Sequence, residues 1–194
     1  MEKLKRDDLF SLEKYAEVRN DFRARVMSHK ENRQLHIGPH ATLYLEDRLT
    51  MQYQVQEMLR AERIFEAEGI QEELDVYNPL VPDGSNWKAT FMIEYEDEAE
   101  RKEALAKLLG VEKKLWMRVA GFGSVTPIAN EDLDRETEEK TSAVHFLRFE
   151  LTGDMVLALK GGASVAAGIS HPAYDVTVDP VPANIRQALL DDLE

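Results

Sequence analysis

The apolar positions near the start of the chain repeat at the spacing of a helix. Tyr15, Val18, Phe22 and Val26 recur every three or four residues, and acidic side chains precede basic ones. This order suits the helix dipole, so the pattern predicts one or two helices over residues 7–30. After a break at residues 38–39, residues 40–46 alternate between polar and apolar, which predicts a strand.

A second helical pattern covers residues 55–66, and Gly69 is predicted to cap it. Apolar side chains gather on one side of this predicted helix, and Glu62 and Glu66 point between them. At a spacing of four, the two carboxylates share one face and could hold one cation or one shared proton. An unpaired buried carboxylate is costly, so the alternative is neutralisation by arginines such as Arg60 and Arg63.

The remaining chain predicts two strand–helix–strand units and a closing helix. The first unit covers strand 88–95, helix 97–109 and strand 115–120, and the second covers strand 143–151, helix 153–160 and strand 164–170. The closing helix covers residues 182–193. We therefore predict one α+β domain over residues 1–194, with a helical N-terminal arm (1–35) and an α+β core (36–194). The sheet is expected to be mixed and mostly antiparallel, with helices mainly on one face.

Three histidines and one arginine are candidate site residues. His145 lies on the apolar face of strand 143–151, which is typical of a core histidine but also allows a metal ligand or an acid–base group. Arg148 lies on the opposite face of that strand and could bind an acid. His171 follows a predicted strand, and His40 begins one, at positions where loops commonly carry binding groups.

The amino-acid composition limits the kinds of site and partner that the protein could have. The chain has 194 residues, 43% of them hydrophobic, which suits one filled core. It has no cysteine, which excludes disulfides and thiolate metal sites, so any metal would need His, Asp or Glu ligands. The net charge is −13, and only residues 1–35 carry more basic than acidic side chains, so nucleic-acid binding is not expected. A charged start and no long apolar run predict a cytoplasmic protein without a membrane span.

Two segments approximate known motifs, but neither has the predicted secondary structure that its motif requires. Residues 162–166 approximate a nucleophile elbow, but Ser164 begins a predicted strand instead of ending one. The Gly121-Phe122-Gly123 string has no helix start after it to receive a phosphate. The sequence therefore leaves open whether the protein is an enzyme.

Six strings together resemble a bacterial family of unknown function across nearly the whole chain. They are GPH at 38–40, QEMLRAERI at 56–64, ELD at 73–75, YNPL at 77–80, SAVHFLRF at 142–149 and HPAY at 171–174. The strings contain His40, Glu57, Glu62, His145 and His171, whereas Glu66 lies just outside. The resemblance implies a genomic association with rubrerythrin-like diiron proteins and with iron–sulfur oxidoreductases of the heterodisulfide-reductase type.

Three hypotheses follow for function. The first is an accessory protein of a redox or peroxide-stress system, with a rubrerythrin-like or iron–sulfur redox partner. It would hold a divalent metal (Fe, Mn or Zn) through Glu62, Glu66 and His145, with help from His40 or His171. The second is a small-molecule enzyme with a Glu/His acid–base pair and an anionic substrate held by Arg60, Arg63 or Arg148. The third is an acidic interaction module that docks a basic partner. The oligomeric state stays open.

Overall fold

The computed structural model describes residues 2–131 and 140–194. The helices are α1 (Leu12–Glu31), α2 (Arg48–Glu62), α3 (Ala67–Tyr77), α4 (Glu98–Lys107), α5 (Gly153–Lys160) and α6 (Ala183–Asp191). Short 3-10 turns are η1 (Arg6–Asp8), η2 (Asn78–Leu80) and η3 (Val111–Lys113). The strands are β1 (Gln34–His36), β2 (Ala41–Glu46), β3 (Asn86–Ile93), β4 (Leu115–Val119), β5 (Ile128–Ala129), β6 (Val144–Glu150), β7 (Val165–His171) and β8 (Tyr174–Val178).

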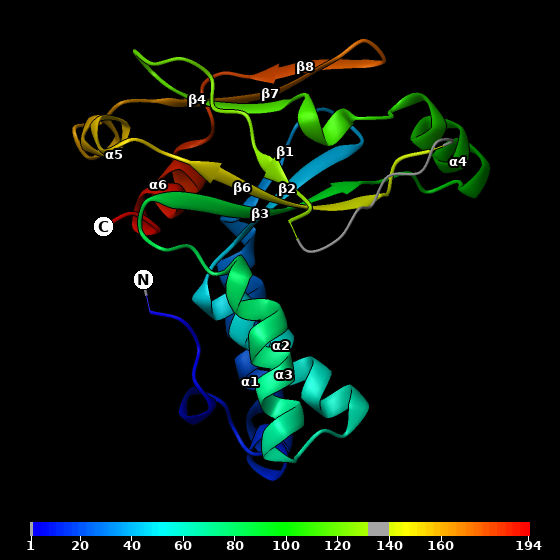
Figure 1. Ribbon diagram of the computed structural model, residues 1–194, viewed down its shortest axis with the longest axis vertical. Coiled ribbons are helices and arrows are strands. Elements are labelled where there is room, and N and C mark those ends of the chain that lie inside the picture. The colour runs from blue at the N-terminus through cyan, green and yellow to red at the C-terminus, as the bar shows by residue number, and fades with distance from the viewer. Residues whose placement is uncertain (1, 132–139) are drawn as a thin grey trace.

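The strands form two antiparallel sheets that share one apolar core. One sheet has the order β1-β2-β3-β6-β5, and the other has the order β4-β7-β8 (Figure 1). Burial alternates along β3 and β6, as expected for strands with one face against a core. The largest buried cluster draws on both sheets, with Trp87, Phe91 and Phe149 from one and Met117 and Val165 from the other. The α+β prediction is confirmed, although the strands are divided between two sheets instead of forming one.

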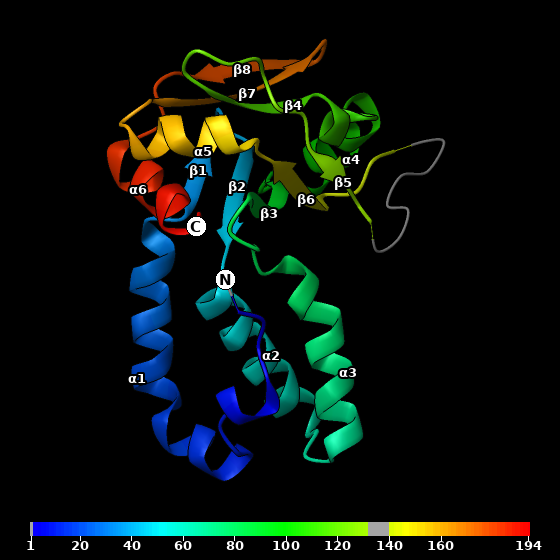
Figure 2. The same ribbon diagram turned by 60° about the vertical axis from the view of Figure 1, so that its left-hand side comes forward.

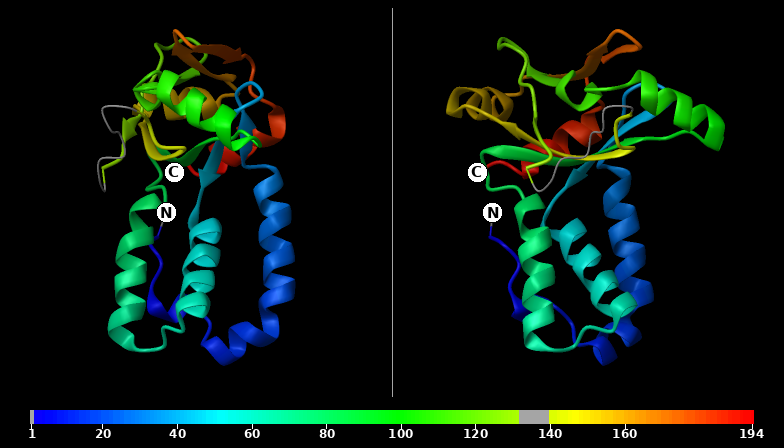
Figure 3. Two further views of the ribbon diagram at one scale, coloured as in Figure 1. Left: turned by 90° about the vertical axis from the view of Figure 1, so that its right-hand side faces the viewer. Right: turned by 45° about the vertical axis from the view of Figure 1, so that its right-hand side comes forward.

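Helices α1, α2 and α3 project together away from the sheets and form what we call the arm (Figures 2 and 3). The arm is larger than the predicted N-terminal helix, because α2 and α3 are inserted between β2 and β3. Glu57 of α2 ties it to α1, since it accepts hydrogen bonds from Tyr15 Oη at 2.6 Å and from Arg19 Nε and Nη2 at 2.8 and 2.7 Å. No described helix has the length and apolar character needed to cross a membrane.

Helix α2 ends earlier than the sequence predicts. Arg63 adopts the left-handed conformation with φ 58°, and the backbone N–H of Ile64 reaches back to the carbonyl of Leu59 at 2.9 Å. Such an end usually carries glycine, which tolerates positive φ. Gly69 lies instead in the first turn of α3, where an added Cβ would meet Ile64 Cγ2 at 2.8 Å. Glycine is therefore placed for close packing and not for capping.

This early end overturns the geometry expected for the two glutamates. Glu62 is the last residue of α2, and Glu66 precedes the first residue of α3, so they do not stack on one helical face. Both side chains are exposed. The expectation of a buried carboxylate pair on one continuous helix is therefore wrong, because the chain turns between them.

A cluster of charged side chains lies where α1 meets β1, β2 and the C-terminal helix. Arg33 is buried and forms two hydrogen bonds to the Asp192 carboxylate, at 3.0 and 2.8 Å. It also lies 3.1 Å from Asp47, whose other neighbour is His29 Nε2 at 2.6 Å. Burial raises the pKa of Asp192 to about 6, against the opposing effect of Arg33. These four residues, which we call the junction cluster, fasten the arm to the sheets.

Candidate functional site

His145 is completely buried between the sheets and is held by named partners. Asn130 Oδ1 accepts from the backbone N–H of Phe146, so its Nδ2 donates to His145 Nδ1 at 3.0 Å. His145 Nε2 then carries the proton and donates to the carbonyl of Ser142 at 3.0 Å, with Thr141 Oγ1 at the same distance. This is the arrangement of a core histidine whose tautomer is fixed by its neighbours.

His40 and His171, from distant parts of the sequence, lie at the same end of the structure. The backbone N–H of His40 donates to Tyr174 Oη at 3.2 Å, and Tyr174 Oη donates to the carbonyl of Ile37 at 2.7 Å. His171 Nδ1 accepts from the backbone N–H of Ala173, so its Nε2 donates to the carbonyl of Leu109 at 3.1 Å. Two of the six family strings, GPH and HPAY, are thus joined through Tyr174.

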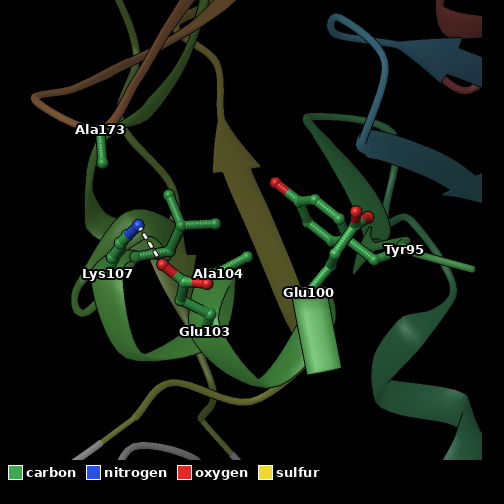
Figure 4. A pocket seen from close by; sticks show the side chains of 7 residues that line it. Tyr95, Glu100, Glu103, Ala104, Lys107 and Ala173 are labelled. Atoms are coloured by element: carbon green, nitrogen blue, oxygen red, sulfur yellow. Dashed lines mark hydrogen bonds and ion pairs between the residues drawn. The ribbon is translucent and has the colours of Figure 1, made fainter. Parts of the chain in front are cut away.

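A small cavity of about 240 Å³, the Tyr95 pocket, lies beside these histidines. The ring of Tyr95 stacks on His40, with centroids 3.9 Å apart. Figure 4 shows Tyr95 and Glu100 on one side of the pocket and the Glu103–Lys107 ion pair on the other. That pair is 2.6 Å long and highly exposed. The charged side chains here are either paired or open to solvent, so the pocket has little to attract a specific ligand.

A larger cavity of about 530 Å³, the Lys88–Arg148 pocket, lies between the end of the arm nearest the sheets and the open face of the five-stranded sheet. Its apolar lining is Val76, Tyr77, Pro79, Leu80, Phe146 and Leu147. Its charged lining is Asp75, Lys88, Glu131 and Arg148. The volume falls in the usual range for small-molecule sites, and the mixture of an apolar wall with a few charged groups is typical of them.

The two cations of this pocket lie directly opposite one another on neighbouring strands. Lys88 of β3 is the register partner of Arg148 of β6 and, on its other side, of Glu46 of β2, whose carboxylate accepts hydrogen bonds from Thr50 and Thr90. Arg148 is neutralised, because it donates to both carboxylate oxygens of Glu131, at 2.8 and 2.6 Å, and also contacts Glu150. These hydrogen bonds raise the pKa of Arg148 and lower that of Glu131.

Lys88 has no such partner. Among residues 2–131 and 140–194, its ammonium group makes neither a hydrogen bond nor an ion pair. Burial, followed by the charge of Arg148, lowers the pKa of Lys88 below its usual value. Lys3 adds a further positive charge nearby, and its Nζ donates to the carbonyls of Asn78 and Val81 at 2.8 and 2.7 Å. Two cations, Lys88 and Arg148, and two acids, Asp75 and Glu131, thus line the cavity.

The candidate residues predicted from the sequence lie in four separate places. Arg148 lines the Lys88–Arg148 pocket; His145 lies between the sheets; His40 and His171 lie beside the Tyr95 pocket. The remaining candidates are exposed at the far end of the arm, and they are Arg60, Glu62, Arg63 and Glu66. The described residues contain no group of three or more His, Asp or Glu side chains placed to hold a metal ion. The structure therefore does not bring Glu62, Glu66 and His145 together, and their metal role stays a prediction.

Sequence reasoning missed Lys88. The alternation of strand 88–95 places it on the polar face, but a lysine there is normally a solvated residue. Only the strand register reveals that it faces Arg148. A search for like charges at facing positions of predicted neighbouring strands could have found the pair.

Comparisons with known proteins agree with the resemblance seen in the sequence. A family model described as "Protein of unknown function (DUF3501)" matches residues 3–193. The chain is similar to a crystal structure of a novel protein of unknown function from Burkholderia pseudomallei K96243, with 50% sequence identity and a TM-score of 0.94. That match covers 100% of both chains. No curated protein matches this chain. The expected association with rubrerythrin-like and iron–sulfur proteins stays a prediction.

Proposed function

Because the chain belongs to DUF3501, a family of proteins of unknown function, we propose a function from the geometry alone. The protein binds a small molecule with one anionic group and an apolar body in the Lys88–Arg148 pocket. The observation that carries the proposal is the half-buried ammonium group of Lys88, which lines the pocket beside Arg148 and makes neither a hydrogen bond nor an ion pair among the described residues.

The cross-strand arrangement explains why an anion would bind there. Like charges directly opposite one another destabilise a sheet. Glu131 and Glu150 offset the charge of Arg148, but neither lies within ion-pair distance of Lys88. A bound carboxylate or phosphate would give Lys88 the partner that it lacks, and burial would strengthen the attraction.

The walls of the pocket define the remainder of the ligand. Tyr77, Pro79 and Leu80 come from α3 and η2, and Phe146 comes from the open face of β6. An apolar chain or ring placed between these two walls would leave water while its charged end stays at Lys88. The ligand class is therefore an amphipathic anion of modest size.

The pocket supports binding more directly than catalysis. Arg148 was predicted to hold an anionic substrate, and its place in the pocket agrees with that part of the enzyme hypothesis. The acid–base partners of that hypothesis lie elsewhere, because His145 is buried on the other face of β6 and Glu62 is at the far end of the arm. A redox or metal role for the protein remains a separate hypothesis, which rests on the family resemblance.

Calorimetric titration with three ligands of equal chain length tests the proposal. Octanoate should bind, whereas octylamine and 1-octanol should bind at least about tenfold more weakly, because only octanoate can pair with Lys88. Octyl phosphate, as a fourth ligand, shows whether the pocket prefers a phosphate to a carboxylate. Equal binding of octylamine and octanoate would contradict the proposal.

Two lysine variants locate the binding. Lys88→Gln should weaken octanoate binding by about tenfold without lowering thermal stability. Lys160→Gln, at an exposed lysine in the last turn of α5, is the matched control and should leave binding unchanged. If both variants bind octanoate like the native protein, the anion is not held at Lys88.

A further inference from the structure

The end of the arm farthest from the sheets carries a second hollow, of about 640 Å³. We call it the arm-end hollow. It lies between the N-terminal segment and the turn that joins α2 to α3. Figure 2 shows these two segments at the end of the arm away from the sheets. Its apolar lining is Leu9, Phe10, Leu12, Leu59, Ile64, Phe65 and Ile70. Its other lining residues are Ser11, two acids, Asp7 and Glu13, and one base, Arg6.

Phe65 stands at the edge of this hollow with 70% of its surface exposed. The turn that holds it is well defined, because Arg63 ends α2 and Ile64 packs into the apolar cluster of the arm. Phe65 follows immediately and points outward. A large aromatic side chain beside an apolar hollow is a common feature of protein-binding surfaces, where aromatic residues are enriched.

Acidic side chains outnumber basic ones around the hollow, although Arg6 lines it and Arg60 and Arg63 are exposed nearby. Helix α3 carries Glu68, Glu72, Glu73 and Asp75 and has no lysine or arginine. Burial and the nearby carboxylates of Glu62 and Glu72 raise the pKa of Glu73, so these acids are close enough to repel one another. A cationic partner would relieve that repulsion.

We propose that the arm-end hollow and Phe65 dock a basic amphipathic helix of another protein. Apolar side chains of that helix would enter the hollow beside Phe65, and its lysines or arginines would face Glu66, Glu68 and the acids of α3. This is the helix-in-groove mode of recognition, in which apolar anchors supply affinity and flanking charges select the partner. The inference is independent of the Lys88–Arg148 pocket, which lies at the other end of α3.

Charge argues against a second copy of this chain as the occupant. Each copy has a net charge of −13, so two copies meeting at an acidic surface would repel one another. A basic partner has the opposite sign, and its association should be fast at low salt and weaken as salt screens the charges.

A synthetic peptide of leucine and lysine, with all leucines on one helical face, tests the inference by fluorescence anisotropy. We expect saturable binding that weakens with salt. Phe65→Asp should weaken it by roughly tenfold or more, as loss of an interface anchor does. Leu157→Asp is the matched control, because Leu157 is 68% exposed on α5, away from the arm, and should leave binding unchanged. The double variant Glu66→Lys/Glu68→Lys should weaken binding while Phe65 stays in place.

Several results would overturn the inference. They are no binding, equal binding of a scrambled Leu/Lys peptide or of the corresponding Leu/Glu peptide, and equal effects of the Phe65 and Leu157 variants. Sedimentation of the free protein supplies one more: a dimer that Phe65→Asp dissociates would assign the hollow to a second copy. Octanoate titration of Phe65→Asp separates the two proposals, because that variant should bind octanoate like the native protein.

Discussion

The junction cluster and the Lys88–Arg148 pocket both hold cations away from bulk water, but Arg33 of the cluster forms ion pairs and Lys88 of the pocket does not, within the described part of the chain. Arg33 has 3% of its surface exposed and meets two carboxylates, one of them through two hydrogen bonds. Lys88 is half-buried, faces Arg148 and makes no ion pair among the described residues. A buried charge in an ion pair serves the stability of the fold, whereas a half-buried charge that makes no ion pair is available to a ligand.

The two clusters should therefore also differ in how much they contribute to the stability of the fold. The junction cluster joins segments that are far apart in sequence, because Arg33 and Asp192 are 159 residues apart. Removing Arg33 would leave Asp192 buried without a cation. In the pocket, by contrast, the charge of Arg148 is offset by Glu131 and Glu150, and Lys88 makes no ion pair among the described residues, so little of the stability depends on Lys88.

Arg33→Ala should have the largest effect on stability. It would leave Asp192 and Asp47 without their shared cation, and breaking a buried ion pair in this way costs about 3–5 kcal/mol. Urea denaturation monitored by circular dichroism measures the loss. The combined variant Arg33→Met/Asp192→Leu should recover much of it, since the buried carboxylate of Asp192 is then gone and Asp47 keeps His29 as a partner.

Lys88→Ala provides the direct contrast with Arg33→Ala. It removes a half-buried ammonium group that makes no ion pair among the described residues, so the free energy of unfolding should change by no more than about 0.5 kcal/mol. If Lys88→Ala and Arg33→Ala destabilise the protein equally, then Lys88 is also needed for stability, and it is not set apart from Arg33 as a binding residue.

Glu57→Gln tests charge pairing that is only partly buried. Hydrogen bonds from Arg19 and Tyr15 lower the pKa of Glu57 below its ordinary value of 4.5. Its stabilising contribution is therefore complete above pH 4.5 and is lost as the pH falls through the native pKa. We expect the variant to lose about 1 kcal/mol at neutral pH, by loss of charge-assisted hydrogen bonds.

The pH dependence distinguishes this pairing from simple packing. Urea unfolding at successive pH values below 4.5 should bring the native protein and Glu57→Gln towards equal stability. A difference that stays constant through this range would mean that the glutamate acts through its shape and not its charge.

Regular periodicity made part of the fold predictable. The alternation in strand 143–151 placed His145, Leu147 and Phe149 on the buried face, and all three are buried. The helix predicted over residues 153–160 matches α5 (Gly153–Lys160). Strand β8 (Tyr174–Val178) was missed because it is only five residues long, although Tyr174, Val176 and Val178 alternate with exposed polar residues and pack against the core.

The candidate site was less predictable, because it depends on contacts between distant segments. Arg148 was found from its place on a polar face, but the facing of Lys88 depends on strand register. The partners of Arg33 are equally invisible in the sequence, since Asp192 lies at the other end of the chain. The end of α2 was misplaced because Arg63, which is not glycine, occupies a left-handed position.

Arg63→Gly should have the smallest effect on stability. Unlike Arg33 and Lys88, Arg63 is neither ion-paired, within the part of the chain that the structure describes, nor buried. Arg63 is exposed and makes no ion pair among the described residues, so its loss removes only the strain of a positive φ in a residue with a Cβ. We expect a gain of roughly 0.5 kcal/mol in the free energy of unfolding, and unchanged octanoate binding. Arg60→Gly, three residues earlier and inside α2, is the matched control and should lose about 1 kcal/mol, because glycine disfavours a helix interior. If both changes destabilise the protein, the side chain of Arg63 stabilises the fold. Exposed cations of the arm would then contribute to stability, as Arg33 does.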